Sequence, residues 1–395
     1  MTSSGFTIRI RLLPFVLLTC LSQTAIAQNG GVNLGVGGVG ISFGNSKQWS
    51  GLRFNIRDDA VRRINGLNLT VWKAGKNPDF VMNGLALGVV GPEAAEFNGI
   101  AVGIGGVVAD RAIRGISLGG LGVVSNGRIS GVSVAGLGLV SQWDLEGINL
   151  AGLGAVSTGS MTGITVAGLG AVSQRNLDGI AVAGLGVVAN GSMTGISVSG
   201  LGTVADREMT GIHTGGLAVV AQRSITGLAT GGLAVVTNAD ISGVATGGLA
   251  VVADGRIRGL ATGGLGVVAS GGLEGAAVGG LGVVVTGGPL TGLAVALGAI
   301  EGTAGVEGLA IAGFRVRSKL ERLRGLMIAG ITNRTTDLTG VGISVYNDIR
   351  GEQQGLTIGL FNSADELHGV QIGLLNRARN NHGIFGVLPL VNAHF

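Results

Sequence analysis

The sequence predicts an all-β protein built from tandem glycine-rich repeats, most simply an up-and-down transmembrane β-barrel. Three observations predict this fold: glycines that recur at a constant spacing, valine and isoleucine between them, and charges that gather in the turns. Glycine accounts for 79 of the 395 residues, a density that disfavours long helices. The alternative architecture is a β-solenoid, in which each repeat forms one coil.

The composition excludes several other classes of protein. Charged residues make up 12% of the chain, about half of the usual share, whereas hydrophobic residues make up 46%. Disordered chains are rich in charge and poor in β-branched residues, and five prolines cannot support a collagen helix. The net charge of +4 provides no concentrated basic face, so we expect no nucleic-acid partner. This composition also does not fit an ordinary soluble enzyme.

Residues 1–27 have the three parts of a secretory signal peptide. Arg9 and Arg11 precede the apolar run Leu12–Leu18, and a small-x-small cleavage site ends at Ala27. The protein is therefore expected to be exported. The single cysteine, Cys20, lies inside this segment, and the alternative interpretation is a lipoprotein lipidated at that residue. Elsewhere glycine interrupts every apolar run, so no transmembrane helix is predicted.

The remaining chain, residues 28–395, is expected to form a single repeat-built β domain. Regular 16-residue repeats occupy residues 99–290, and looser repeats of about 14–17 residues occupy 51–98 and 291–395. We interpret each unit as a strand of about nine to eleven residues followed by a turn of about five. The marker glycines of the regular region are Gly99, Gly115, Gly131, Gly147, Gly163, Gly179, Gly195, Gly211, Gly227, Gly243, Gly259 and Gly275.

The absence of charge from the expected strands indicates a membrane. The nine residues after each marker glycine from Gly115 to Gly275 include no Asp, Glu, Lys or Arg. A soluble sheet with one wet face would alternate apolar with polar residues, but these segments are apolar or small on both faces. A charge on the lipid face of a membrane strand costs roughly 2–4 kcal/mol. We therefore expect a barrel of about 20–22 strands, with outer-membrane lipid as a partner.

The turns offer a clue to the choice between barrel and solenoid. Glycine occupies the third turn position in five of six alternate turns, with Arg223 in the sixth, which suggests a duplicated block, two repeats long, that forms a hairpin. A hairpin block favours a barrel, although a two-coil block of a solenoid would give the same spacing. The glycines concerned are Gly127, Gly159, Gly191, Gly255 and Gly287.

The C-terminal residues alternate in a way that points to the same fold. The apolar members of this alternation are Val387, Pro389, Val391, Ala393 and the terminal Phe395, of which Val387, Val391, Ala393 and Phe395 are the candidate insertion signal. They resemble the closing strand of bacterial outer-membrane β-barrels, whose terminal aromatic residue is part of the signal read by the barrel-insertion machinery. The resemblance implies that this machinery is a partner. Aromatic residues are only 4% of the chain, too few for two full girdles, so a channel or transporter ranks third among our hypotheses.

Two late repeats carry a resemblance to a known family. Gly355–Asn362 reads GLTIGLFN, and Gly369–Asn376 reads GVQIGLLN. They resemble the tandem units of bacterial surface-repeat proteins of the leptospiral type, which also occur in other Gram-negative bacteria. The resemblance covers roughly Gly325 to Phe395 and implies placement at the surface or outer membrane, with no catalytic residues to carry over. The central repeats depart from the unit, because they lack its asparagine and add Gly-Leu-Gly.

No motif supports catalysis, and we predict no catalytic, cofactor-binding or metal-binding residue. Gly35–Gly40 matches a dinucleotide-binding pattern but precedes no helical segment, and Ser117 is one variant of a repeat position. The four histidines lack metal-ligand spacing. The mixed, charged stretch Lys47–Lys76, which includes Trp72, is interpreted as a first strand pair or an interfacial cap.

One basic segment is a candidate for contact with a membrane surface. Its cations would either be solvated in a loop or contact anionic headgroups by charge attraction. They are Arg315, Arg317, Lys319, Arg322 and Arg324.

The sequence thus predicts an exported outer-membrane or surface protein with a structural or interaction role and no catalytic activity. The alternative is a secreted or surface-anchored β-solenoid that acts in adhesion or matrix assembly, and the third hypothesis is an outer-membrane channel or transporter. Which protein or glycan it binds is left open.

Overall fold

The computed structural model describes residues 26–27, 30–319 and 322–395. Apart from residues 26–27, the predicted signal peptide and Cys20 lie outside the described residues. The prediction of an all-β protein is confirmed, because strands form about 70% of the chain. The described residues include no α-helix and one 3₁₀ turn, η1 (Gly383–Gly386). The chain divides into two compact units, unit 1 up to Gly159 and unit 2 from Ser160.

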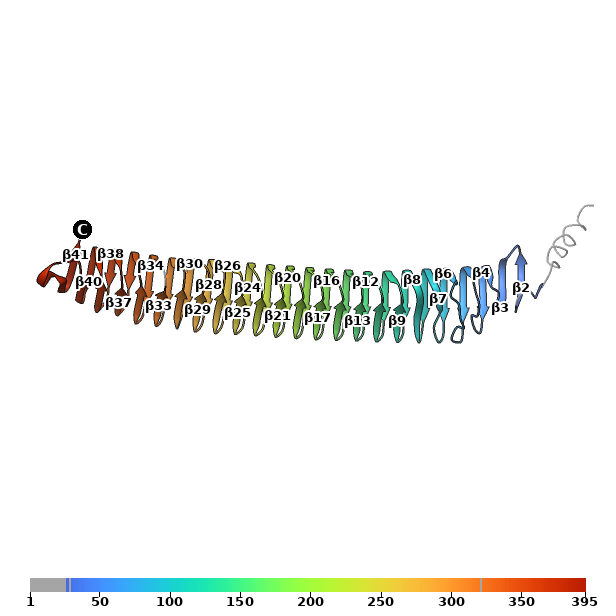
Figure 1. The fold of residues 1–395 in the computed structure, drawn as a ribbon. Coiled ribbons are helices and arrows are strands. Elements are labelled where there is room, and N and C mark those ends of the chain that lie inside the picture. The colour runs from blue at the N-terminus through green and yellow to red at the C-terminus, as the bar shows by residue number, and fades with distance from the viewer. Residues whose placement is uncertain (1–25, 28–29, 320–321) are drawn as a thin grey trace, which may run out of the picture. The chain divides into compact units, whose positions relative to one another are not determined.

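Unit 2 is a β-solenoid in which each coil has two strands (Figure 1). The longer strand has six to eight residues and the shorter has four. The longer strands are β14 (Met161–Ala167), β16 (Leu177–Ala183), β18 (Met193–Ser199), β20 (Met209–Gly215), β22 (Ile225–Gly231), β24 (Ile241–Gly247), β26 (Arg256–Gly263), β28 (Gly272–Gly279), β30 (Leu290–Ala296), β32 (Val306–Ala312), β34 (Leu323–Ala329), β36 (Leu338–Ile343) and β38 (Glu352–Ile358). The shorter strands are β15 (Gly170–Ser173), β17 (Gly186–Ala189), β19 (Gly202–Ala205), β21 (Ala218–Ala221), β23 (Ala234–Thr237), β25 (Ala250–Ala253), β27 (Gly266–Ala269), β29 (Gly282–Val285), β31 (Ala299–Gly302), β33 (Arg315–Ser318), β35 (Thr332–Thr335), β37 (Tyr346–Ile349) and β39 (Phe361–Ala364).

Successive coils pair in parallel, with equivalent repeat positions opposite each other. Gly211 pairs with Gly195 and with Gly227, so the marker glycines form one row. Longer strands pair with longer ones and shorter strands with shorter ones. Each coil therefore contributes to two faces, which we call the long-strand face and the short-strand face.

The prediction of an up-and-down barrel is wrong, and the solenoid alternative agrees with the structure. An up-and-down barrel requires antiparallel neighbours, whereas these neighbours are parallel. The expected strands of nine to eleven residues are also broken, because Gly216 and Leu217 form a corner between β20 and β21. The hairpin block of two repeats is wrong for the same reason: equivalent residues of successive repeats lie side by side, so neighbouring turns share one edge of the coil.

Two glycines in each coil are required by the close stacking of the backbone. Gly211 has φ +122°, a left-handed conformation that side chains rarely adopt, and a Cβ atom there would overlap the carbonyl oxygen of Gly195. A Cβ atom at the corner residue Gly216 would overlap the carbonyl oxygen of Gly200. The high glycine content thus follows from coils that stack backbone on backbone.

The interior of each coil is filled by small and medium apolar side chains. In one coil Ile225 and Ala229 of β22 and Val235 of β23 are fully buried. The residues between them face outward, and Leu228 is exposed. The sequence correctly indicated that both faces of each strand are apolar, but one face is the interior of the coil and the other is its exterior.

Unit 1 also stacks parallel coils after an antiparallel start, but its first coils, β4 to β6, contain one strand each. Strands β1 and β2 and then β2 and β3 pair antiparallel, and the pairing is parallel from β3 to β4 and onward. An antiparallel pair at the end of a stack covers the open edge of the first coil. The strands are β1 (Ile26–Ala27), β2 (Gly31–Val36), β3 (Val39–Gly44), β4 (Gln48–Asn55), β5 (Arg63–Thr70), β6 (Val81–Gly88), β7 (Glu93–Gly103), β8 (Gly106–Gly119), β9 (Gly122–Ser125), β10 (Arg128–Ala135), β11 (Gly138–Ser141), β12 (Leu145–Ala151) and β13 (Gly154–Ser157).

The last coils of unit 2 contain a buried ladder of asparagines. Asn333, Asn347, Asn362 and Asn376 are buried, and each of the first three donates a side-chain hydrogen bond to the next at 2.7–3.0 Å. The unit then ends with β40 (Glu366–Ala378) and the antiparallel β41 (Val387–His394). The asparagine that ends the family-like repeat unit is therefore an interior residue, and Val316 occupies the same register position one coil before Asn333.

Candidate functional site

The most distinctive surface of unit 2 is a row of leucines at the corner that joins each longer strand to the next shorter one. Leu217 and Leu233 are typical: each donates its backbone N–H at 2.7 Å to the carbonyl of the leucine one coil earlier. These bonds fix the corner, so the side chains project at regular intervals. We call this row the leucine edge. It comprises Leu169, Leu185, Leu201, Leu217, Leu233, Leu249, Leu265, Leu281 and Leu297.

The leucine edge is exposed along its whole length. Exposed fractions run from 45% at Leu249 to 77% at Leu297. Parallel strands lie about 4.8 Å apart, so the nine leucines extend over about 38 Å. A second apolar row lies farther along the long-strand face, where Ile180, Ile196 and Ile212 are exposed one coil after another. The outward position between the two rows is held by Val182, Val198 and then Thr214. Single exposed leucines are ordinary on soluble proteins, but an unbroken row of nine exposed leucines is typical of an interaction surface.

The opposite edge of the same coils is polar and charged. The turns from each shorter strand to the next longer one hold Arg207 and Glu208 in one coil and Arg223 in the following coil. Arg223 lies 3.7 Å from Glu208, and Asn238 donates to Gln222 at 2.6 Å in the same register. Such exposed ion pairs contribute little to stability. Each coil therefore has a polar edge, which we call the charged edge, opposite the apolar leucine edge.

The predicted basic segment does not form a single patch. Arg315 and Arg317 lie on β33 of the short-strand face, and Arg324 lies on β34 of the long-strand face. Lys319 and Arg322 lie in the turn between these strands, on either side of residues 320–321, which are not described. Contact of these five residues with anionic headgroups stays a prediction.

Three of the five cations of this segment already have carboxylate partners. Arg315 pairs with Glu301, Arg322 lies 4.0 Å from Asp337, and Arg324 lies 3.7 Å from Glu307. These pairs reduce the positive charge that the segment can offer to a ligand.

The residues predicted to form an insertion signal lie together at the C-terminal end of unit 2. Val387, Val391 and Ala393 are exposed on β41, and Phe395 follows that strand. Asn392 between them is buried and hydrogen-bonded to the ladder through the carbonyl of Asn376 at 3.3 Å. Strand β41 covers the last coil of a solenoid rather than closing a barrel. Recognition by an insertion machinery stays a prediction.

The residues set aside as non-catalytic occupy structural positions. Ser117 is buried and donates a hydrogen bond to Ser133 Oγ at 2.8 Å, one coil along. His213 is buried with its Nδ1 2.8 Å from Ser197 Oγ. Burial lowers the pKa of His213, and a hydrogen bond that the ring donates to the backbone of Thr210 partly opposes that shift. Within the described residues, no group of three His, Cys, Asp or Glu side chains could hold a metal ion.

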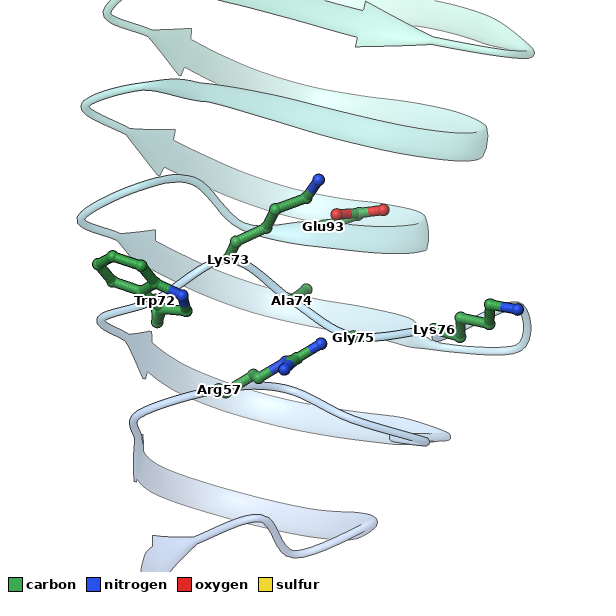
Figure 2. Close-up of a pocket in the computed structure, with 7 residues that line it drawn as sticks. All are labelled: Arg57, Trp72, Lys73, Ala74, Gly75, Lys76 and Glu93. Carbon is green, nitrogen blue, oxygen red and sulfur yellow. The ribbon is translucent and has the colours of Figure 1, made fainter.

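Unit 1 contains a small pocket that our sequence reasoning did not identify as a site (Figure 2). The pocket has a volume of about 360 Å³, and we call it the Trp72 pocket. Figure 2 shows Trp72 and Lys76 at its two ends, Arg57 on one side, and Lys73 and Glu93 on the other. The only signal in the sequence was the concentration of charged and aromatic residues in the stretch 47–76.

Comparisons with protein-family models, curated proteins and solved structures found no match for this chain. Among the residues that the structure describes, no helix is long and apolar enough to cross a membrane.

Proposed function

We propose that this chain is an exported, surface-associated β-solenoid with a structural or interaction role and no catalytic activity. In this proposal the leucine edge lies against the lipid of an outer membrane and the charged edge faces water. The observation that carries it is the leucine edge, nine exposed leucines in nine consecutive coils of unit 2. Export and surface location rest on residues 1–27 of the sequence and remain part of the proposal.

The distribution of charge supports lipid as the partner. An amphipathic helix lies in a membrane interface when one face is apolar and the other charged. The coils of unit 2 repeat that division with strands, because the leucine edge is apolar while Arg207, Glu208 and Arg223 lie on the opposite edge. Removing apolar surface from water contributes about 25 cal/mol of free energy per Å². Contact of the partly exposed leucines with lipid therefore favours membrane binding.

Adhesion or matrix assembly is the second candidate function. It is favoured by the outward residues of the short-strand face, which are uncharged and no larger than valine in consecutive shorter strands: Gly186 and Val188, Gly202 and Val204, and Ala218 and Val220. A face made of such residues is flat enough for a second copy to pack closely against it. This candidate predicts concentration-dependent self-association without lipid.

Vesicle flotation of the purified full chain tests the proposal. We expect the protein to float with vesicles of phosphatidylethanolamine and phosphatidylglycerol. A triple variant with Leu201→Gln, Leu217→Gln and Leu233→Gln should lose at least about four-fifths of the floating fraction, because three apolar side chains would no longer favour lipid. The control variant carries Thr194→Gln, Thr210→Gln and Thr226→Gln, which are exposed in the same coils near the charged edge.

The control variant should float like the unchanged protein. Equal flotation of the leucine variant and the unchanged protein would contradict a lipid-facing leucine edge. Self-association of the unchanged protein in the absence of vesicles, with no flotation in their presence, would favour the second candidate instead.

A further inference from the structure

We propose that the Trp72 pocket binds an acidic sugar residue, whose ring lies against Trp72 and whose carboxylate lies between Arg57 and Lys73. The proposal is independent of lipid contact by the leucine edge, because the pocket lies in unit 1 and the leucine edge in unit 2.

The pocket lies on two loops that interrupt the regular coils. Residues 56–62 join β4 to β5, and residues 71–80 join β5 to β6. The loops are bound to each other at three places: Trp72 N–H donates to the carbonyl of Ile56 at 2.7 Å, Gly75 N–H to that of Asp58 at 2.6 Å, and Ala60 N–H to that of Lys76 at 3.2 Å. Their backbones are therefore held in place before any ligand arrives, which lowers the entropic cost of binding.

A buried polar network anchors the first loop to the coils beneath it. Asp58 is fully buried and pairs with the buried Arg53 of β4. Its carboxylate also accepts hydrogen bonds from Asn68 Nδ2 at 3.0 Å and Thr70 Oγ1 at 2.8 Å, both on β5. Asn77 of the second loop donates to the backbone carbonyl of Asp58 at 3.1 Å. Arg53 and Asp58 are buried and bonded to each other, so they are not available to a ligand. Only the outward side chains of the two loops can contact one.

The cations of the pocket form no close ion pair within the described residues, although the charge of Lys73 acts on Glu93. Arg57, Lys73 and Lys76 form no ion pair with any residue in the described part of the chain, and Glu93 is the one carboxylate in the lining. A second pocket of unit 1 shows the contrast: there Arg114 lies 3.0 Å from Glu96, and Arg128 lies 3.1 Å from Asp144. The Trp72 pocket therefore has an excess of positive charge that an anion can neutralise.

Trp72 and Glu93 narrow the class of anion to a sugar acid. Trp72 is 61% exposed, so its ring offers an apolar surface that fills no core. A pyranose ring stacks on such a surface, and a carboxylate such as Glu93 accepts hydrogen bonds from sugar hydroxyls. Glu93 is half-buried, and this burial raises the pKa of Glu93 against the opposing charge of Lys73. Glu93 would repel a doubly charged phosphate more strongly than a singly charged uronate. The volume of about 360 Å³ falls within the range of small-molecule sites.

Calorimetric titration of the full chain with trigalacturonate tests the proposal. We expect binding of trigalacturonate and at least about tenfold weaker binding of neutral maltotriose, of acetate and of inorganic phosphate, because each probe lacks either the charge or the ring. Trp72→Ala and the double variant Arg57→Gln, Lys73→Gln should each weaken trigalacturonate binding at least about tenfold.

Matched controls separate this site from general charge. Trp143→Ala removes the exposed tryptophan of the second pocket, and the double variant Arg175→Gln, Arg207→Gln removes two turn arginines of unit 2. Both controls should bind trigalacturonate like the unchanged chain, and all variants should keep its circular dichroism and melting temperature.

Three outcomes would overturn the proposal. They are equal binding of trigalacturonate and maltotriose, equal loss in the control variants, and no trigalacturonate binding by the unchanged chain, including the case in which the chain instead binds anionic vesicles through Trp72. The last outcome would assign the pocket to a membrane surface. Failure of flotation by the leucine edge would leave the titration unaffected, so the two proposals fail separately.

Discussion

At the residue scale, a marker glycine acts through both its conformation and the space it leaves. Gly211 combines a positive φ with a backbone contact that leaves no room for a Cβ atom. Gly202, the first residue of β19, differs: a Cβ atom there would lie 3.9 Å from the carbonyl oxygen of Ala218, an ordinary contact, and Ala218 itself occupies the equivalent position of the next coil. The repeat therefore contains glycines that the backbone requires and glycines that it merely tolerates.

This difference predicts opposite results for two glycine substitutions. Gly211→Ala should lower the free energy of unfolding by roughly 2 kcal/mol or more, because alanine would be strained at that φ and would push the coils apart. Gly202→Ala should change it by less than about 0.5 kcal/mol. Urea unfolding followed by circular dichroism measures both, and an equal effect of the two substitutions would contradict the assignment.

The structural roles of some residues could be predicted from the sequence, and those of others could not. The marker glycines were visible because their spacing never slips over the regular region. The corner at Gly216 and Leu217 was hidden, because a turn without polar residues or proline looks like the middle of an apolar strand. The Trp72 pocket was hidden as well, since its side chains are brought together by two loops whose hydrogen bonds no spacing rule describes.

At the element scale, the direction of strand pairing determines the fold, and a repeat does not encode it. A repeat of this length fits one antiparallel strand per unit as well as one coil per unit. The alternation of glycine at Gly127, Gly159 and Gly191 suggested hairpins, yet in unit 2 the turns of successive coils lie on the same edge. We have no physical account of that alternation. The asparagine ladder could not be predicted from the sequence either, because the repeat unit that ends at Asn362 does not show whether this side chain faces inward.

The parallel register predicts a specific disulfide. Thr194 and Thr210 are Cα partners on β18 and β20, and both are exposed. Neighbouring strands lie about 4.8 Å apart, within the Cα separation of 4.4–6.8 Å that a disulfide spans. In a Cys20→Ser background, Thr194→Cys with Thr210→Cys should crosslink under mild oxidation, seen as faster migration in denaturing electrophoresis.

A pair two coils apart provides the control for this crosslink. Thr194→Cys with Thr226→Cys places the cysteines about 9.6 Å apart, too far for a disulfide. Crosslinking of the control pair, or none of the first pair, would be incompatible with parallel coils.

At the scale of the whole molecule, a faithful repeat turns single residues into continuous surfaces. One leucine in each coil becomes the leucine edge, and one polar turn in each coil becomes the charged edge. Neither surface exists in a single repeat, since each depends on the parallel register that places equivalent residues side by side. The sequence therefore predicted the chemistry of the exterior, apolar with charged turns, but not its division between two edges of one coil.

The most direct test of this account compares the two edges in the presence of lipid. Single cysteines at Leu217→Cys and at Gln222→Cys, in the Cys20→Ser background, would carry an environment-sensitive nitrobenzoxadiazole label. These positions lie on opposite edges, at the two ends of β21. On addition of anionic vesicles, the account predicts a blue shift and at least about twofold brighter emission at position 217, and no change at position 222. An equal response at both positions, or a response at position 222 alone, would contradict it.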